Sequence, residues 1–288
     1  MENSCTLLKK IVLLGSFLFL YSCSQDEMIN VDLQKNASKS FNEKMSADKV
    51  IKFKGPQVTL GDGKVRSWVS VDLAGDPKEI GIEMTREALL NPQGDKKSSP
   101  PAGSTIVIPL HPKASQVTPF DHIGLNWNPN GHEPEHVFDV PHFDIHFYMI
   151  SVEEQLAIPE YSPSTDALFN NLPPMEYWPE NYFTPPGSAT AEAQMGKHWI
   201  PTNLGDFLPF TKIMIYGSFD GNFIFVEPMV TLNYLLLNVE SRNNAYSQPL
   251  KFAKAGNYPT KYNIYNDPKT GNIKITLSDF IHRVATPY

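Results

Sequence analysis

Cysteine is nearly absent from this chain. Only two of its 288 residues are cysteines, Cys5 and Cys23, and both lie near the N-terminus. Beyond residue 23 the chain can therefore have no internal disulfide, no thiolate nucleophile and no sulfur ligand for zinc. The stability of that part must come from the packing of its core or from a metal held by nitrogen and oxygen atoms.

The sequence also lacks several features that would indicate a class of function. Lysine and arginine number 24 against 31 Asp and Glu, and the net charge of -7 argues against a nucleic-acid binder, because binding phosphates requires a basic surface. No apolar run reaches the roughly 20 residues of a membrane-spanning helix. We find no glycine-rich phosphate loop and no GxSxG nucleophile motif.

Turn-forming residues are abundant and predict a mainly β fold. The 25 prolines and 17 glycines disfavour long helices, and a hydrophobic content of 41% is enough to bury a core. No linker or internal repeat is evident in the later part of the chain. We therefore expect a single barrel-like or sandwich domain over residues 53–288, with a few short helices.

Local patterns place the expected elements. Alternation around Gly61-Asp62-Gly63 predicts a hairpin over residues 57–73. Short helices are expected after Thr85 and over residues 151–158, where Ser151 and Glu154 form a capping box. Residues 159–187 carry seven prolines and predict a long ordered loop or lid. Further strands are expected at 79–84, 105–110, 210–216, 223–237 and 273–277.

The N-terminus has the pattern of an export signal. Lys9 and Lys10 precede an apolar run over residues 11–21, which is too short for an ordinary membrane-spanning helix. The following Leu-Tyr-Ser-Cys at 20–23 resembles a bacterial lipoprotein cleavage box. The resemblance implies that residues 1–22 are a lipoprotein signal peptide, removed before Cys23, and that Cys23 is acylated.

The residues after Cys23 suggest where the protein is held. Ser24 resembles an outer-membrane sorting signal, and Asp26-Glu27 resembles the tag of some surface-exported lipoproteins. Polar residues without periodicity continue from there, so residues 23–52 are expected to be a lipidated flexible tether. We expect a cell-envelope protein, lipid-anchored in the outer membrane and potentially surface-exposed, with the bilayer as a partner through Cys23.

Five of the eight histidines lie between residues 121 and 148, which is an unusual concentration. Within it, the segment 142–147 alternates polar and apolar residues and is expected to be a strand. His142, Asp144 and His146 then lie on one face, with neighbours about 6.6 Å apart. The two imidazoles are about 13 Å apart on a straight strand, so both bind one ion only if the strand bends.

The preceding segment contains a motif that resembles a helical zinc-protease site. His132 and His136 have the spacing of HExxH, but Pro134 lies between them, and proline inside a helix costs about 3 kcal/mol. We therefore interpret this segment as a loop. A loop can still bring His132 or His136 back to the strand.

Two more candidate residues occur later in the chain. His198 follows Gly196 and precedes a tryptophan, so it is either a site residue or a packed core residue. Glu227 ends an apolar strand, where a carboxylate needs a cation, a metal or a hydrogen-bond donor unless the strand end is exposed. Either residue fits a site or an ordinary structural role.

Several motifs together resemble a family of exported bacterial proteins of unknown function, here behind a lipoprotein signal peptide. The resemblance covers about residues 55–240 and implies a β-rich fold in which His142, His146, His198 and Glu227 come together. It implies no established reaction. The motifs are GHEP at 131–134, DVPHFDIHFY at 139–148, MGKHW at 195–199, YGSFDG at 216–221 and EPM at 227–229.

These observations predict a pocket that binds a divalent metal, with zinc favoured, or a small ligand. Glu227 is the candidate for a general base if it is not itself a ligand. A metal-dependent enzyme acting on a small molecule is one alternative. A structural or stress protein of the envelope with no bound metal is the other. The candidate metal ligands are His132, His142, Asp144, His146, His198 and Glu227.

Overall fold

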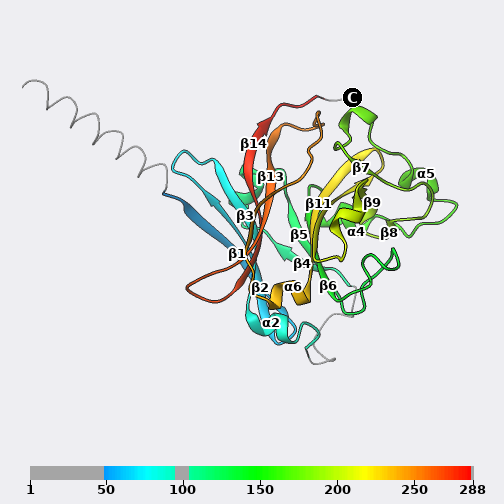
Figure 1. Ribbon diagram of the computed structural model, residues 1–288. Coiled ribbons are helices and arrows are strands. Elements are labelled where there is room, and N and C mark those ends of the chain that lie inside the picture. The colour runs from blue at the N-terminus through cyan, green and yellow to red at the C-terminus, as the bar shows by residue number, and fades with distance from the viewer. Residues whose placement is uncertain (1–48, 95–103, 287–288) are drawn as a thin grey trace, which may run out of the picture. The chain divides into compact units, whose positions relative to one another are not determined.

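The computed structural model describes residues 49–94 and 104–286 (Figure 1). Residues 47–288 form one compact unit that holds every strand of the described residues and its own core, which is what independent folding requires of a domain. The predicted signal peptide, Cys23 and most of the predicted tether lie outside the described residues. In the part that is described, no helix is long and apolar enough to cross a bilayer.

Two antiparallel sheets make up the domain (Figure 1). The first sheet has the order β1 (Ile51–Leu60), β2 (Gly63–Val71), β3 (Pro77–Met84), β14 (Ile273–Arg283), β13 (Gly256–Asn266) and β12 (Ser241–Ala245). The second has the order β4 (Ile106–Pro109), β5 (His122–Asn128), β6 (His142–Tyr148), β11 (Asn222–Thr231), β10 (Lys212–Phe219), β9 (Gly196–Pro201) and β7 (Tyr182–Phe183), and β8 (Ala191–Glu192) also pairs with β9.

Short helices connect the strands. In residues 49–94 and 104–286 they are α2 (Arg86–Leu90), α3 (Pro112–Val117), α4 (Val152–Leu156), α5 (Asp166–Phe169) and α6 (Leu232–Leu236), with 3-10 turns η1 (Met175–Tyr177) and η2 (Leu204–Phe207). None exceeds two turns, in keeping with the high content of proline and glycine.

The core lies between the two sheets. Ile80 and Ile275 of the first sheet belong to the same buried apolar cluster as Phe143, Ile145 and Phe147 of the second. Each sheet ends in edge strands that have one neighbour only, so neither sheet closes on itself. The mainly β prediction is therefore confirmed, and the architecture is a sandwich and not a barrel.

Several local predictions are also confirmed. β1 and β2 form the hairpin around Gly61 and Asp62. The hydroxyl of Ser151 accepts from the backbone N–H of Glu154, and the Glu154 carboxylate accepts from the backbone N–H of Ser151, as a capping box requires. The proline-rich segment 159–187 contains only α5, η1 and β7 and is otherwise irregular.

Two expectations differ from the structure. Residues 232–236 form α6 instead of continuing a strand, because Thr231 caps a helix by accepting from the N–H of Tyr234. Residues 256–266 form the long strand β13, which is not among the strands expected from the sequence, because this segment contains Pro259 and many polar residues. Proline is tolerated there because β12 pairs with β13 only between residues 261 and 264. Pro259 is therefore paired with β14 and not with β12.

The β13–β14 turn gives a pH-dependent prediction. The Asp267 carboxylate accepts from the ammonium of the buried Lys274 and from the N–H of Lys269, and these bonds lower the pKa of Asp267 to about 2. We expect Asp267→Asn to lower the free energy of unfolding by about 1 kcal/mol at neutral pH.

The sign of this effect follows from the lowered pKa. The contribution of Asp267 is complete above its unfolded pKa near 4 and decreases as the pH falls toward 2. Urea unfolding of Asp267→Asn and the unsubstituted domain at pH 7 and about pH 3 measures it. An equal difference at both pH values would contradict the assignment of this stability to an ionised Asp267.

Candidate metal centre

Strand β6 separates the core from the candidate site. Phe143, Ile145 and Phe147 point into the sandwich core, so His142, Asp144 and His146 point to the other face of the same sheet. We call this the outer face, because it faces away from the first sheet. All three polar residues are at least 96% buried, since loop segments cover this face.

Two loop segments provide that cover. Phe138, from the segment between β5 and β6, packs with Met229 of β11 in one apolar cluster. Ile158, which follows α4, and Phe169 of the proline-rich segment pack with Tyr148 and Phe225 in another. The outer face is therefore a second buried layer with polar side chains at its centre.

The six predicted ligand residues meet in two groups of three. The His198 group contains His146, His198 and Glu227, and the His132 group contains His132, His142 and Asp144. In each group one potential ligand atom per residue lies within 4.8 Å of the others. His142 and His146 thus belong to different groups, as their separation along a nearly straight strand requires.

The His198 group is assembled from three strands. The register of β6 with β11 pairs Val226 with Phe147 and Met229 with Asp144, which sets Glu227 opposite His146. Oε2 of Glu227 lies 3.3 Å from Nε2 of His146 and 3.8 Å from Nε2 of His198 on β9. Both Glu227 and His146 are at most 1% exposed.

Gly217 makes room for this group. It pairs with His198 on one side and with Phe225 on the other. A Cβ at residue 217 would lie 2.0 Å from the Phe225 ring, so only glycine fits. The Phe225 ring in turn packs against the imidazoles, at 4.7 Å from His146 and 5.4 Å from His198 between centroids.

The His132 group combines β6 with a loop. Nε2 of His142 lies 3.1 Å from Oδ1 of Asp144, and Nε2 of His132 lies 3.4 Å from Oδ2. His132 reaches the strand because Gly131 adopts a positive φ and the His132 N–H donates to the carbonyl of Phe138. The His132 side chain is 42% exposed, so this group opens toward solvent.

Three imidazoles are held in the orientation that suits metal binding. Nδ1 of His132, His142 and His198 each lies at hydrogen-bond distance from a backbone carbonyl, at 2.7, 2.6 and 2.9 Å. A carbonyl only accepts, so Nδ1 carries a proton, and in the neutral ring Nε2 therefore keeps its lone pair. The acceptors are Glu133, Val140 and Thr190 in that order.

The atoms that face one another lack hydrogen-bond partners. In the described part of the chain, Nε2 of His146, Oε2 of Glu227 and Oδ1 of Asp144 are buried without any such bond, despite the short distances above. Buried polar atoms are nearly always satisfied. Lone pairs on nitrogen and on a carboxylate that converge in this way fit a cation between them, and the residues present therefore suit a divalent metal.

Burial sets the charges of the His198 group. It lowers the pKa of His146 to about 3, and it lowers the pKa of His198 as well. Burial also raises the pKa of Glu227 well above its ordinary value, and the charge of Asp144 adds to this rise. Without a metal, burial therefore disfavours the charged form of all three residues.

The His132 group has the opposite charge pattern. Burial opposes ionisation of Asp144, but the imidazoles of His132 and His142 outweigh burial and hold its pKa well below its usual range. Burial likewise opposes protonation of His132, yet Asp144 raises its pKa. Asp144 therefore remains a carboxylate even when no metal is bound.

The remaining histidines of the block have other roles. His122 is buried with both ring nitrogens partnered, by Asp121 at 3.0 Å and by Gln155 at 2.8 Å. The His136 side chain is 84% exposed and joins neither group. The segment 131–141 is a loop, as expected from Pro134, and of its two histidines only His132 returns to β6.

Sequence reasoning missed Asn128. Its amide donates to Oδ2 of Asp144 at 2.5 Å and lies 3.4 Å from Nε2 of His142. Alternation of Ile123, Leu125 and Trp127 with smaller or polar residues in β5 was the available signal. It places Asn128 on the outer face directly opposite His142.

Comparison of the chain with protein-family models, with curated proteins and with solved structures found no match in any of the three. The resemblance to exported bacterial proteins stays a prediction from the motifs. The case for function therefore depends on the geometry described above.

Proposed function

We propose that this chain is a metal-binding lipoprotein of the cell envelope. Its folded domain binds a divalent ion in the His198 group, and acylated Cys23 anchors it in the outer membrane. The observation that carries the proposal is the convergence of Nε2 of His146 and Oε2 of Glu227, both buried and without hydrogen bonds. A bound cation would satisfy both atoms at once.

The donor set favours zinc. Two imidazoles and one carboxylate, with no sulfur, form a set that catalytic zinc sites use, although iron, manganese, nickel and copper also accept these ligands. The His132 group has the same composition and is more open to solvent. We assign it a second, more readily exchanged ion.

The number of ligands supports one alternative function. Three protein ligands leave a coordination position for water or substrate, which is the usual arrangement in metal-dependent enzymes. A purely structural zinc site has four protein ligands. Turnover of a small molecule at this position is therefore the second candidate.

Elemental analysis of the purified unit 47–288 tests the proposal. After removal of all metal and dialysis against zinc, we expect two ions per chain. His146→Ala and His198→Ala should each lose one ion, and His142→Ala should lose the other. His136→Ala, an exposed histidine outside both groups, is the matched control and should keep both.

Circular dichroism of each variant verifies that it remains folded. No retained metal in the unsubstituted domain would refute metal binding and favour a purely structural histidine network. The anchor is tested separately in the full chain, where Cys23→Ser should release the protein from the membrane fraction.

A further inference from the structure

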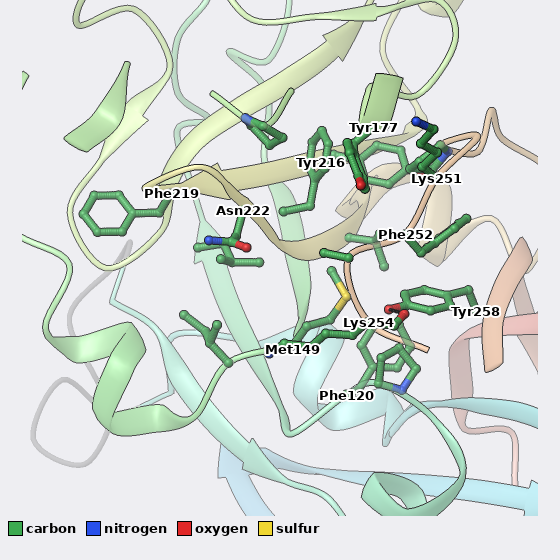
Figure 2. Close-up of a pocket in the computed structure, with 18 of the residues that line it drawn as sticks. Phe120, Met149, Tyr177, Tyr216, Phe219, Asn222, Lys251, Phe252, Lys254 and Tyr258 are labelled. Carbon is green, nitrogen blue, oxygen red and sulfur yellow. Dashed lines mark hydrogen bonds between the residues drawn. The ribbon is translucent and has the colours of Figure 1, made fainter. Parts of the chain in front are cut away.

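The domain also contains a separate cavity of about 570 Å³, shown in close-up in Figure 2. Its walls come from the ends of β10 and β11, from α4 and from the segment 246–255 between β12 and β13. In Figure 2 the rings of Tyr177 and Tyr216 lie on one side of the opening, and Met149 and Tyr258 lie on the other. This volume is typical of sites for small molecules.

The cavity lies apart from the metal groups. Val226 lines the cavity and belongs to the sandwich core, whereas the next residue, Glu227, faces the opposite side of β11. Successive residues of a strand point to opposite faces of the sheet. Binding in the cavity therefore does not depend on the proposed function.

The lining is apolar although it is rich in tyrosine. Tyr177, Tyr216, Tyr246 and Tyr258 all line the cavity, and each hydroxyl already donates to a backbone carbonyl. The rings therefore offer hydrocarbon surface and few free donors. This chemistry disfavours a sugar, which needs many hydrogen bonds, and favours an aliphatic chain.

The charged residues at the cavity favour an anionic end group. Lys254 is exposed and forms no ion pair within 4 Å in the described ranges, and Lys251 has only a half-exposed partner, Glu176, at 3.4 Å. Two acidic residues, Glu154 and Asp220, also line the cavity; both carboxylates already accept hydrogen bonds, and Glu154 interacts with Lys254 only at a distance beyond an ion pair. Glu154 caps α4 through Ser151, and Asp220 accepts from Asn171 at 2.9 Å.

From these observations we propose that the cavity binds a medium-chain fatty acid. The aliphatic chain occupies the space among the aromatic rings, and the carboxylate lies at the rim beside Lys254 and Lys251. Each of these lysines is at the surface, so a carboxylate reaches them without crossing the apolar lining.

Calorimetric titration of the unit 47–288 with decanoate tests the proposal. We expect one saturable site with a Kd below about 1 mM, in metal-free and metal-loaded protein alike. The double variant Lys251→Gln/Lys254→Gln should bind decanoate about fivefold more weakly and bind decanol unchanged. Both lysines are exposed or half-exposed, so the fold is unaffected.

A variant whose side chain fills the cavity tests whether decanoate binds there. Ala157 lines the cavity and is exposed, so Ala157→Trp should reduce decanoate binding at least about tenfold through steric exclusion. Leu156→Trp, at the adjacent exposed residue outside the lining, should have no effect. Absence of saturable decanoate binding, equal affinity for decanol, or equal loss in the two tryptophan variants would overturn the proposal.

Discussion

Glu227→Gln is expected to remove ion binding from the His198 group without destabilising the metal-free domain. Glutamine keeps the size of the side chain but cannot supply an anionic ligand. We expect the affinity of this group for zinc to fall by more than about 100-fold, because even loss of a residue that only supports a ligand costs 10–100-fold. The His132 group should retain its ion.

The metal-free domain should respond differently. Burial raises the pKa of Glu227 well above its ordinary value, so an ionised Glu227 at neutral pH lowers the stability of the folded state. Glutamine has no such ionisation. The free energy of unfolding of Glu227→Gln in chelator should therefore equal or exceed that of the unsubstituted domain, within about 1 kcal/mol.

Urea unfolding with and without zinc measures both effects in one series. Glu240→Gln is the matched control, because Glu240 is 51% exposed and pairs only with Arg242 at the surface. It should change neither the zinc-dependent nor the metal-free stability. A loss of more than about 2 kcal/mol in metal-free Glu227→Gln would show that Glu227 serves the fold and not an ion.

The parts of the site that lie on one strand could be predicted from the sequence. The alternation over residues 142–147 is a local pattern, and it correctly places His142, Asp144 and His146 on one face and the aromatic residues in the core. The same local geometry limits the distance that two imidazoles can span. That limit explains why two groups form instead of one shared cavity.

The approach of residues distant in sequence could not be predicted. Glu227 lies opposite His146 only because β11 pairs with β6, and His198 comes near only because β10 intervenes with a glycine. The order of strands in a sheet depends on the packing of the whole core and leaves little local signal. The motif resemblance implied a grouping that also included His142, which lies in the His132 group, and it supplied no geometry.

The sequence could predict which segments are loops, but not the path that each loop follows. Pro134 indicated that residues 131–141 form a loop, yet the return of His132 to β6 depends on a positive φ at Gly131 and a bond to Phe138. The strand β13 was missed because its polar residues and Pro259 resemble a turn, and only pairing with β14 reveals it.

Asp144→Asn is expected to have the opposite effect from Glu227→Gln in the metal-free domain. Asp144 is 4% exposed, accepts from Asn128 and lies beside two imidazoles, which hold its pKa well below its usual range against the effect of burial. Removing the charge weakens the hydrogen bond from Asn128, which loses its anionic acceptor. Loss of a hydrogen bond to a charged group typically costs about 1.5–3 kcal/mol.

The direction of this change in the free energy of unfolding follows from proton linkage. A carboxylate with a lowered folded pKa contributes stability above its unfolded pKa near 4, so the contribution of Asp144 is complete at neutral pH. Asp139→Asn is the control, because Asp139 lies in the loop that precedes β6 and its side chain is 47% exposed. Urea unfolding in chelator at pH 7 should show a loss of about 2 kcal/mol for Asp144→Asn and a much smaller loss for Asp139→Asn. Equal effects of the Asp144 and Glu227 substitutions would contradict the assignment of opposite pKa shifts to two carboxylates on one face of the same sheet.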